Sequence, residues 1–227
     1  MRPSGFRIAM LYDSAYAPAG DVVARVNASY AEASGYGYSI NVQTCSTHGA
    51  VLRRSPSWRK VGCVMHELVN CEWLLWVDAD ALIVNRDFKL ESLVKADKDL
   101  LLSSDSCGYC AGVFMIRNTA WSFDLLRAWL FCGELSEDVP FGGPLRNRLS
   151  DQGSLVALIK CFPGIADRVG AIPTEVVQNP ECPYHPDAFM VHYWGNCLGP
   201  GYELIRKAVE VYEREGRYTP EVKAPAL

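Results

Sequence analysis

The sequence has no long run of apolar residues and no excess of positive charge. None of its apolar stretches approaches the roughly 20 residues that a membrane-spanning helix needs, so we expect no membrane span. The chain carries 22 lysines and arginines against 26 aspartates and glutamates, a formal net charge of -4. This balance gives no basic field for a phosphate backbone, so nucleic acid is not an expected partner.

The N-terminus lacks the features of a secretory signal. Its apolar segment is short and reaches Asp13 without a small-residue cleavage site. We therefore expect a cytoplasmic protein, with a trimmed membrane anchor as the alternative. Repeats and linkers are also lacking, which predicts a single domain over residues 1–227 with a flexible tail at 218–227. Nothing in the pattern indicates an oligomeric state.

Cysteine is not scarce, but its spacing does not form a metal site. The chain has nine cysteines, and Cys107 and Cys110 make the only CxxC pair. A structural zinc would need a second pair. The pattern leaves reduced thiols and a local disulfide open as alternatives.

The most informative stretch is residues 72–85, EWLLWVDADALIVN. Residues 73–77 are apolar without alternation, which predicts a strand that is covered on both faces. Asp78 and Asp80 follow this strand directly. Carboxylates at the end of a buried strand are costly unless something compensates them, and a divalent cation is the natural partner. We therefore expect a metal site at this point.

The elements before this strand predict an α/β fold. Residues 6–12 and 38–44 have the composition of strands, and residues 21–33 and 56–70 show helical spacing. This alternation predicts a mostly parallel central sheet flanked by helices. Ligands of such sheets bind beyond the carboxyl ends of the strands. Tyr12 and Asp13 end the first strand, so we expect them near Asp78 and Asp80, as contacts for a base and a ribose.

Two of these assignments have plainer alternatives. Asp13 also suits a loop as a turn-forming residue. Arg59 and Lys60 lie near the N-terminal end of the helix at 56–70, where the helix dipole disfavours cations. A phosphate bound by Lys60 would explain the pair, and a solvated pair of cations is the alternative.

The second half of the chain supplies further candidate residues. Strands are expected at 99–104, 112–117, 168–172 and 189–194, and helices after Asn118, after Ser150 and at 203–213. Residues 131–149 lack periodicity, and we expect them to form a lid or an acceptor-side loop. Residues 173–187 are expected to form a proline-rich loop. Asp151 and Gln152 open the helix that Ser150 caps. His192 on the last strand is either a third metal ligand or an ordinary strand residue.

Two carboxylates and an imidazole suit Mn²⁺, or Mg²⁺, with open positions for oxygen ligands. A diphosphate is the expected oxygen donor, and the ion would neutralise charge on a departing nucleotide diphosphate. Phosphotransferases of the haloacid-dehalogenase type also carry a DxD motif, with the first aspartate as a nucleophile on the first strand. Asp78 follows the third expected strand, which disfavours that alternative.

Four segments together resemble the retaining glycosyltransferases of the GT-A fold: WLLWVDADALIVN, CAGVFMIRNTAWSFDLLRAWL, SDQGSLVALI and FMVHYWGN. The chain is most similar to the family that contains fungal α-galactosyltransferases and plant xyloglucan xylosyltransferases. The resemblance implies a Rossmann-like GT-A domain, Mn²⁺ and a nucleotide-sugar donor, most often a UDP-sugar. It also implies a glycan hydroxyl as the acceptor.

The resemblance further implies roles for single residues. Asp78 is expected on the ribose and metal side, with Asp80 and His192 as metal ligands. Asp151 and Gln152 are expected beside the anomeric carbon, where Asp151 would orient the sugar and Gln152 would steady it during front-face attack through an oxocarbenium-like state. The residues expected to line the donor are Asp105, Gly112 and Gly195.

Three features depart from the family pattern. Family members usually carry an N-terminal Golgi anchor, which we do not expect from this sequence. Position 110 has Cys where the family usually has Asn, and Asn196 separates Gly195 from Cys197. The first departure bears on localisation, and the other two bear on donor identity more than on reaction type. A second hypothesis, from another class, is an inactive module that binds a sugar nucleotide or a glycan. The three convergent ligands argue against it, because an inactive domain has no physical need for them.

Overall fold

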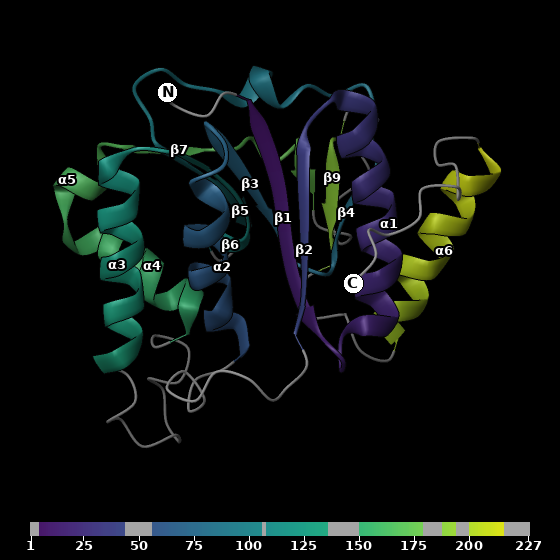
Figure 1. The fold of residues 1–227 in the computed structure, drawn as a ribbon, viewed down its shortest axis with the longest axis horizontal. Coiled ribbons are helices and arrows are strands. Elements are labelled where there is room, and N and C mark those ends of the chain that lie inside the picture. Colours follow the sequence, from purple (N-terminus) through teal and green to yellow (C-terminus); the bar gives the residue numbers. More distant parts are fainter. Residues whose placement is uncertain are drawn as a thin grey trace.

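The computed structural model describes residues 5–43, 56–105, 108–135, 150–178, 188–193 and 200–215. Within them, a central sheet lies between helices, and a smaller sheet lies beside it (Figure 1). The central sheet has six strands in the order β2-β1-β3-β6-β5-β7. Their bounds are β1 (Phe6–Asp13), β2 (Gly37–Gln43), β3 (Trp73–Val77), β5 (Leu100–Asp105), β6 (Gly108–Arg117) and β7 (Val169–Ala171).

Five of these six strands run in the same direction. β1 is parallel to β2 and β3, and β5 is parallel to β7. β6 is antiparallel to both of its neighbours, β3 and β5. The connection from β5 to β6 is too short for a parallel crossover, so it forms a hairpin and reverses the chain. The expected mostly parallel sheet is confirmed, and β1, β2 and β3 end at the same edge.

Helices cover both faces of the central sheet (Figure 1). α1 (Ala17–Ser34) lies on one face, and α2 (Arg59–Leu68), α3 (Ala120–Leu135) and α4 (Asp151–Cys161) lie on the other. α6 (Pro200–Arg214) packs against α1, and the short α5 (Pro163–Ala166) follows α4. Two short 3-10 helices, η1 (Pro56–Trp58) and η2 (Leu90–Leu93), complete the helical elements of the described residues. No described helix is both long and apolar enough to cross a membrane.

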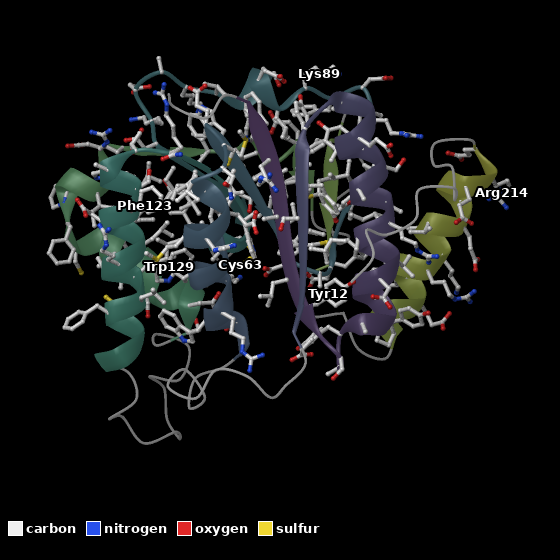
Figure 2. The ribbon with its side chains drawn as sticks, in the orientation of Figure 1. Tyr12, Cys63, Lys89, Phe123, Trp129 and Arg214 are labelled. Atoms are coloured by element: carbon white, nitrogen blue, oxygen red, sulfur yellow. The ribbon has the colours of Figure 1, made fainter. Side chains whose placement is uncertain are left out.

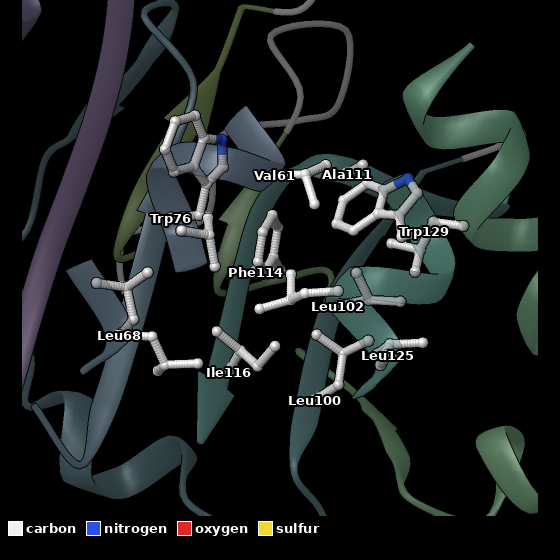
Figure 3. Packing of buried hydrophobic residues seen from close by; sticks show 14 of the residues in the cluster. Val61, Leu68, Trp76, Leu100, Leu102, Ala111, Phe114, Ile116, Leu125 and Trp129 are labelled. Atoms are coloured by element: carbon white, nitrogen blue, oxygen red, sulfur yellow. The ribbon is translucent and has the colours of Figure 1, made fainter. Parts of the chain in front are cut away.

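β3 is the buried centre of the sheet, as its apolar run predicts. All five of its residues are buried, and they alternate between two packing clusters. Leu74 and Trp76 pack toward the layer of α2, α3 and α4, where Trp76 stacks on Phe114 of β6 with ring centroids 6.4 Å apart (Figure 3). The other three side chains pack toward the small sheet. Because both faces of β3 are covered, no position of the strand is polar.

The sequence does not predict the second sheet. Its strands are β4 (Ala81–Ile83), β9 (Met190–His192) and β8 (Val177–Gln178), in the order β4-β9-β8. β4 and β9 are antiparallel, with Ala81 opposite His192. The strand expected at 189–194 therefore pairs with the segment that follows Asp80. β8 lies within residues 173–187, so the expectation of an irregular segment is wrong there.

Two other segments differ from the expectation. Residues 108–111 extend β6 and form the hairpin with β5, and Gly108 permits this turn because its φ is 114°. Residues 131–135 continue α3 and are not irregular. The remainder of the segment expected to form a lid, 136–149, lies outside the described residues, as does the expected tail at 218–227.

Candidate active site

The two aspartates of the DxD segment lie where the chain passes from the central sheet to the small sheet. Asp78 directly follows β3, and its backbone N–H donates to the Gly112 carbonyl of β6 at 2.8 Å. Asp80 directly precedes β4, and its carbonyl accepts the Tyr193 N–H at 2.8 Å. These backbone hydrogen bonds hold both residues at the carboxyl edge of the central sheet, where α/β folds bind ligands.

His192 reaches the two aspartates from the end of β9. Ligand atoms of Asp78, Asp80 and His192 lie within 4.8 Å of one another. The Nε2 atom of His192 is 3.2 Å from Asp80 Oδ1, and these two residues are 7% and 6% exposed. The structure thus brings together the three residues that the sequence singles out. Their role as metal ligands stays a prediction.

The charges of this group perturb one another. Burial alone would lower the pKa of His192, but hydrogen bonds with Asp80 and Cys110 raise it to about 10. Burial raises the pKa of Asp78, the Lys60 ammonium opposes the rise, and Asp80 adds to it. A divalent cation would displace the imidazole proton and favour ionised carboxylates. Protons therefore balance part of the negative charge of this group, and a divalent cation would replace them.

Lys60 of α2 links the DxD segment to α4. Its Nζ lies 3.0 and 3.1 Å from the carboxylate oxygens of Asp78, 3.0 Å from Asp151 Oδ2 and 3.1 Å from the Ala111 carbonyl oxygen. Burial disfavours the charged form, but the two carboxylates outweigh it and raise the pKa of Lys60. Lys60 is only 5% exposed, so the alternative of a solvated pair with Arg59 is wrong for it.

The contacts of Lys60 also bear on the expected phosphate contact. An ammonium has three N–H groups, and Asp78, Asp151 and the Ala111 carbonyl accept them. A phosphate would have to displace one of these acceptors. Binding of a phosphate by Lys60 stays a prediction, whereas its contacts in this structure position two carboxylates.

Asp151 is held as a carboxylate at the start of α4. Burial would raise its pKa, but the Lys60 ammonium and the Ser57 hydroxyl lower it below its ordinary value. The Asp151 backbone is also fixed, because Trp129 Nε1 donates to its carbonyl at 2.7 Å. Asp151 therefore presents a carboxylate whose position is set by contacts with α2 and α3.

Gln152 is oriented by the backbone of β6. Ser150 caps α4 as expected, with its hydroxyl accepting the Gly153 N–H at 3.0 Å. Gln152 is the second residue of α4, and its Oε1 accepts the Ala111 N–H at 3.0 Å. A backbone N–H can only donate, so the amide oxygen is the atom that meets it. The NH₂ group of Gln152 remains to donate to another partner.

β6 bulges at the point where it meets these residues. Leu102 of β5 pairs with Phe114, but the next residue, Ser103, pairs with Cys110. Residues 111–113 are therefore extra on β6. Bulges often re-aim groups beside active sites. This one directs the backbone of residues 111–112 toward α2, α4 and the DxD segment.

Gly112 lies in this bulge, between two of the candidate ligands. A Cβ at this position would be 2.3 Å from His192 Cε1, 2.7 Å from His192 Nε2 and 3.1 Å from Asp78 Oδ2. Any side chain would have to displace the imidazole. The glycine thus lets the His192 imidazole lie against the backbone of β6, beside Asp78. The expectation that Gly112 lines the donor stays a prediction.

Tyr12 and Asp13 end β1 at the same edge of the sheet, and Figure 2 shows Tyr12 near the start of α1. The Tyr12 hydroxyl donates to Asp21 Oδ1 at 2.7 Å, and burial raises the pKa of this phenol. Asp13 Oδ1 accepts the Ala15 N–H at 3.0 Å, and its carbonyl accepts the Tyr16 N–H. These are the contacts of the turn-forming alternative for Asp13. The base and ribose contacts stay predictions.

Two further predicted residues cannot be placed with their side chains. Asp105 is the last residue of β5, opposite Gly108, and the structure does not describe its side chain. Gly195 lies outside the described residues. Their expected contacts with the donor stay predictions.

Sequence reasoning missed three contacts of the site. Trp76 Nε1 donates to Asp78 Oδ1 at 2.7 Å, Ser103 Oγ donates to the Val113 carbonyl at 2.8 Å, and Cys110 Sγ lies 3.7 Å from His192 Nδ1. The spacing of Trp76 and Asp78 could have indicated the first, because residues two apart on an extended chain face the same side. The second contact that the sequence could have indicated is that of Cys110, because this cysteine stands where the family usually has Asn. No local pattern indicates the contact of Ser103.

A family model matches residues 27–140, about half of the 227-residue chain. The family is DUF273, described as a protein family of unknown function. The chain belongs to this family. The part that matches DUF273 contains Lys60, Asp78, Asp80 and Gly112, and it ends before Asp151 and His192.

Curated relatives of this DUF273 member are named as glycosyltransferases. The chain is 31% identical over 148 residues to "Probable glycosyltransferase 6" of Oryza sativa subsp. japonica, covering 52% of this chain and 31% of that protein. It is 25% identical over 174 residues to "Glycosyltransferase 6" of Arabidopsis thaliana, covering 70% and 38%. It is 26% identical over 181 residues to "Probable alpha-1,6-mannosyltransferase MNN10" of Saccharomyces cerevisiae, covering 66% and 44%. The chain spans less than half of the length of these relatives.

Solved structures confirm the expected fold. A glycosyltransferase involved in glycosylation of the major capsid of PBCV-1 superposes with a TM-score of 0.65 at 15% identity, covering 88% of this chain and 98% of that one. The galactosyltransferase LgtC, in complex with donor and acceptor sugar analogues, superposes with a TM-score of 0.54 at 17% identity, covering 93% and 99%. The DUF273 member therefore has the GT-A fold.

Proposed function

We propose that this DUF273 member is a metal-dependent retaining glycosyltransferase. It transfers a sugar from a nucleotide-diphosphate sugar, a UDP-sugar, to a hydroxyl of a glycan acceptor. The convergence of Asp78, Asp80 and His192 at the carboxyl edge of a GT-A sheet carries this proposal. The names of the curated relatives support a transferase, and the resemblance of four segments to retaining enzymes supports the donor and the stereochemistry.

The residues present fit a divalent cation. Two carboxylates and an imidazole form a donor set that suits Mn²⁺ or Mg²⁺. Asp80 is nearly fully buried, so its carboxylate needs a cationic partner, which is the His192 imidazolium without metal and would be the ion once metal is bound. The missing side chain at Gly112 allows the imidazole of His192 to approach the aspartates. When bound, the ion would supply Lewis-acid stabilisation of the leaving nucleotide diphosphate.

The remaining residues position the donor sugar. Lys60 keeps Asp151 ionised and fixes it against Asp78, so Asp151 can orient a sugar hydroxyl as an acceptor. Gln152 has its amide oxygen committed to the Ala111 N–H. It therefore acts on the sugar as a hydrogen-bond donor through its NH₂ group, and it steadies the sugar without serving as the nucleophile. Holding reactants in one geometry is a large part of catalysis for such a transfer.

Gly112→Ala is expected to abolish Mn²⁺ binding. The added Cβ would fall 2.3 Å from His192 Cε1 and displace the imidazole from the aspartates. Calorimetric titration with Mn²⁺ measures the loss, and circular dichroism checks the fold. Gly62→Ala is the matched control, because a Cβ at Gly62 of α2 meets no atom within 4 Å. Wild-type Mn²⁺ affinity in Gly112→Ala would remove His192 from the ion site.

A panel of nucleotide-diphosphate sugars, scored for release of the free nucleotide with and without Mn²⁺, tests the proposed function. We expect Mn²⁺-dependent release of UDP from one or two UDP-sugars. Binding of UDP without release or transfer, with any acceptor, would instead support an inactive sugar-nucleotide module. Trapping of a phosphorylated Asp78 would establish the phosphotransferase alternative.

A further inference from the structure

We propose that Cys110 is a positioning residue for His192: its sulfur accepts the Nδ1–H of the imidazole and so holds Nε2 toward the aspartates. The inference rests on the proposed metal site. Nε2 lies 3.2 Å from Asp80 Oδ1, and Nδ1 lies 3.7 Å from Cys110 Sγ. Each ring nitrogen therefore has a partner among the described residues, and the two partners come from different segments of the chain.

The tautomer of His192 is set by the roles of its two ring nitrogens. A ring nitrogen that ligates a metal must offer a lone pair, so the other nitrogen carries the proton and donates it. With Nε2 at the aspartates, Nδ1 is the protonated nitrogen, and Cys110 Sγ is the acceptor that the structure places beside it. In the metal-free imidazolium, both nitrogens donate, and the same sulfur still accepts from Nδ1. The contact thus serves both states.

The sulfur can position the ring because it is itself fixed. Cys110 is 6% exposed and pairs with Ser103 at the start of the β6 bulge. The backbone N–H of Gly112 donates to Cys110 Sγ at 3.4 Å. Cys110 belongs to the central sheet, whereas His192 belongs to the small sheet, 82 residues away in the sequence. The hydrogen bond therefore ties a ligand from one sheet to the framework of the other.

Removing the sulfur should weaken the metal site rather than the fold. Without an acceptor, the buried Nδ1–H has no partner, and the ring can rotate or change tautomer. Loss of a partner that orients a ligating histidine typically lowers metal affinity by about tenfold to a hundredfold. We expect this effect for Cys110→Ala. Cys110→Ser should restore part of the affinity, because its hydroxyl also accepts a hydrogen bond.

The experiment compares Mn²⁺ affinity of the full chain, measured by calorimetry, in wild type, Cys110→Ala and Cys110→Ser. Cys71→Ala is the matched control, since Cys71 is also buried but lies before β3, at the opposite end of that strand. We expect affinity losses at Cys110 only. Wild-type affinity in Cys110→Ala, or an equal loss in Cys71→Ala, would overturn the proposal.

A second measurement needs no metal and separates this inference from the proposed function. Long-range ¹⁵N spectra of the metal-free protein, assigned with a His192→Gln variant, report the protonation and exchange of Nδ1. We expect a slowly exchanging Nδ1–H in wild type that exchanges faster in Cys110→Ala. If wild type bound no metal, the proposed function would fail, yet this spectral difference would still uphold the contact. Identical Nδ1–H exchange in both proteins would overturn it.

Discussion

Asp80→Asn is expected to lower Mn²⁺-dependent transfer by about three orders of magnitude, because stabilisation by the ion is worth several kcal/mol in the transition state and each 1.36 kcal/mol is tenfold in rate. The substitution keeps the size of the side chain and removes the charge that binds the cation. His192 can give up its proton when its partner is neutral, so no charge is left stranded, and we expect the fold to persist. Initial rates of UDP release measure the effect.

Asp124→Asn is the matched control for this prediction. Asp124 lies on α3 with 74% of its side chain exposed, and it forms an ion pair with the surface residue Arg127. The control should retain wild-type activity. Full activity in Asp80→Asn would contradict the metal assignment, whichever sugar the enzyme uses.

Lys60→Met is expected to lower the free energy of unfolding by about 3 kcal/mol at neutral pH, since breaking a buried ion pair by removing one partner typically costs 3–5 kcal/mol. The lower end applies because 31% of the Asp78 side chain reaches solvent, although Asp151 is nearly buried. Activity should fall as well, because Asp78 and Asp151 lose the contact that positions them. Urea unfolding measures the stability.

The loss of stability in Lys60→Met should depend on pH. In wild type, Lys60 lowers the pKa of Asp151, so the stability it contributes is present at neutral pH and is lost only as the pH falls through that lowered value. In Lys60→Met, burial without the cation raises the pKa of both carboxyl groups above their values in the unfolded state. As the pH falls, the folded state of the variant therefore binds protons at a higher pH than its unfolded state does. The variant should therefore lose stability as the pH rises.

The stability gap between wild type and Lys60→Met should thus be wider at about pH 7.5 than at about pH 5. Lys160→Met is the control, because Lys160 is exposed on the last turn of α4 and its loss should change stability by no more than about 0.5 kcal/mol. A gap that is equal at both pH values would show that Asp78 and Asp151 do not depend on Lys60.

The elements and half of the site could be predicted because local patterns encode them. The apolar run of β3 followed by Asp78 and Asp80 predicts a buried strand that ends in a polar site. The alternation of strands and helices places the end of β1 at the same edge. The sequence predicts Ser150 as a helix N-cap, and the structure confirms it. For His192, the residues alone leave a metal ligand and an ordinary strand residue open, and the family resemblance implies the ligand.

The rest of the site depends on contacts between distant segments. Lys60 looks like an exposed cation from its helix alone, and only the packing of α2 against β3 and α4 buries it. The importance of Gly112 arises from a bulge in the pairing of β5 with β6, which no spacing in the sequence shows. The small sheet could not be predicted because β4 and β9 have only three residues each.

Calorimetric titration of the chain with UDP, first with Mn²⁺ and then after EDTA, tests the central claim most directly. If Asp78, Asp80 and His192 hold an ion that binds the diphosphate, UDP should bind with Mn²⁺, and EDTA should abolish the binding. Asp80→Asn should then behave as the wild type does in EDTA. Binding of UDP that is equally tight with Mn²⁺ and with EDTA would contradict the metal-dependent donor site.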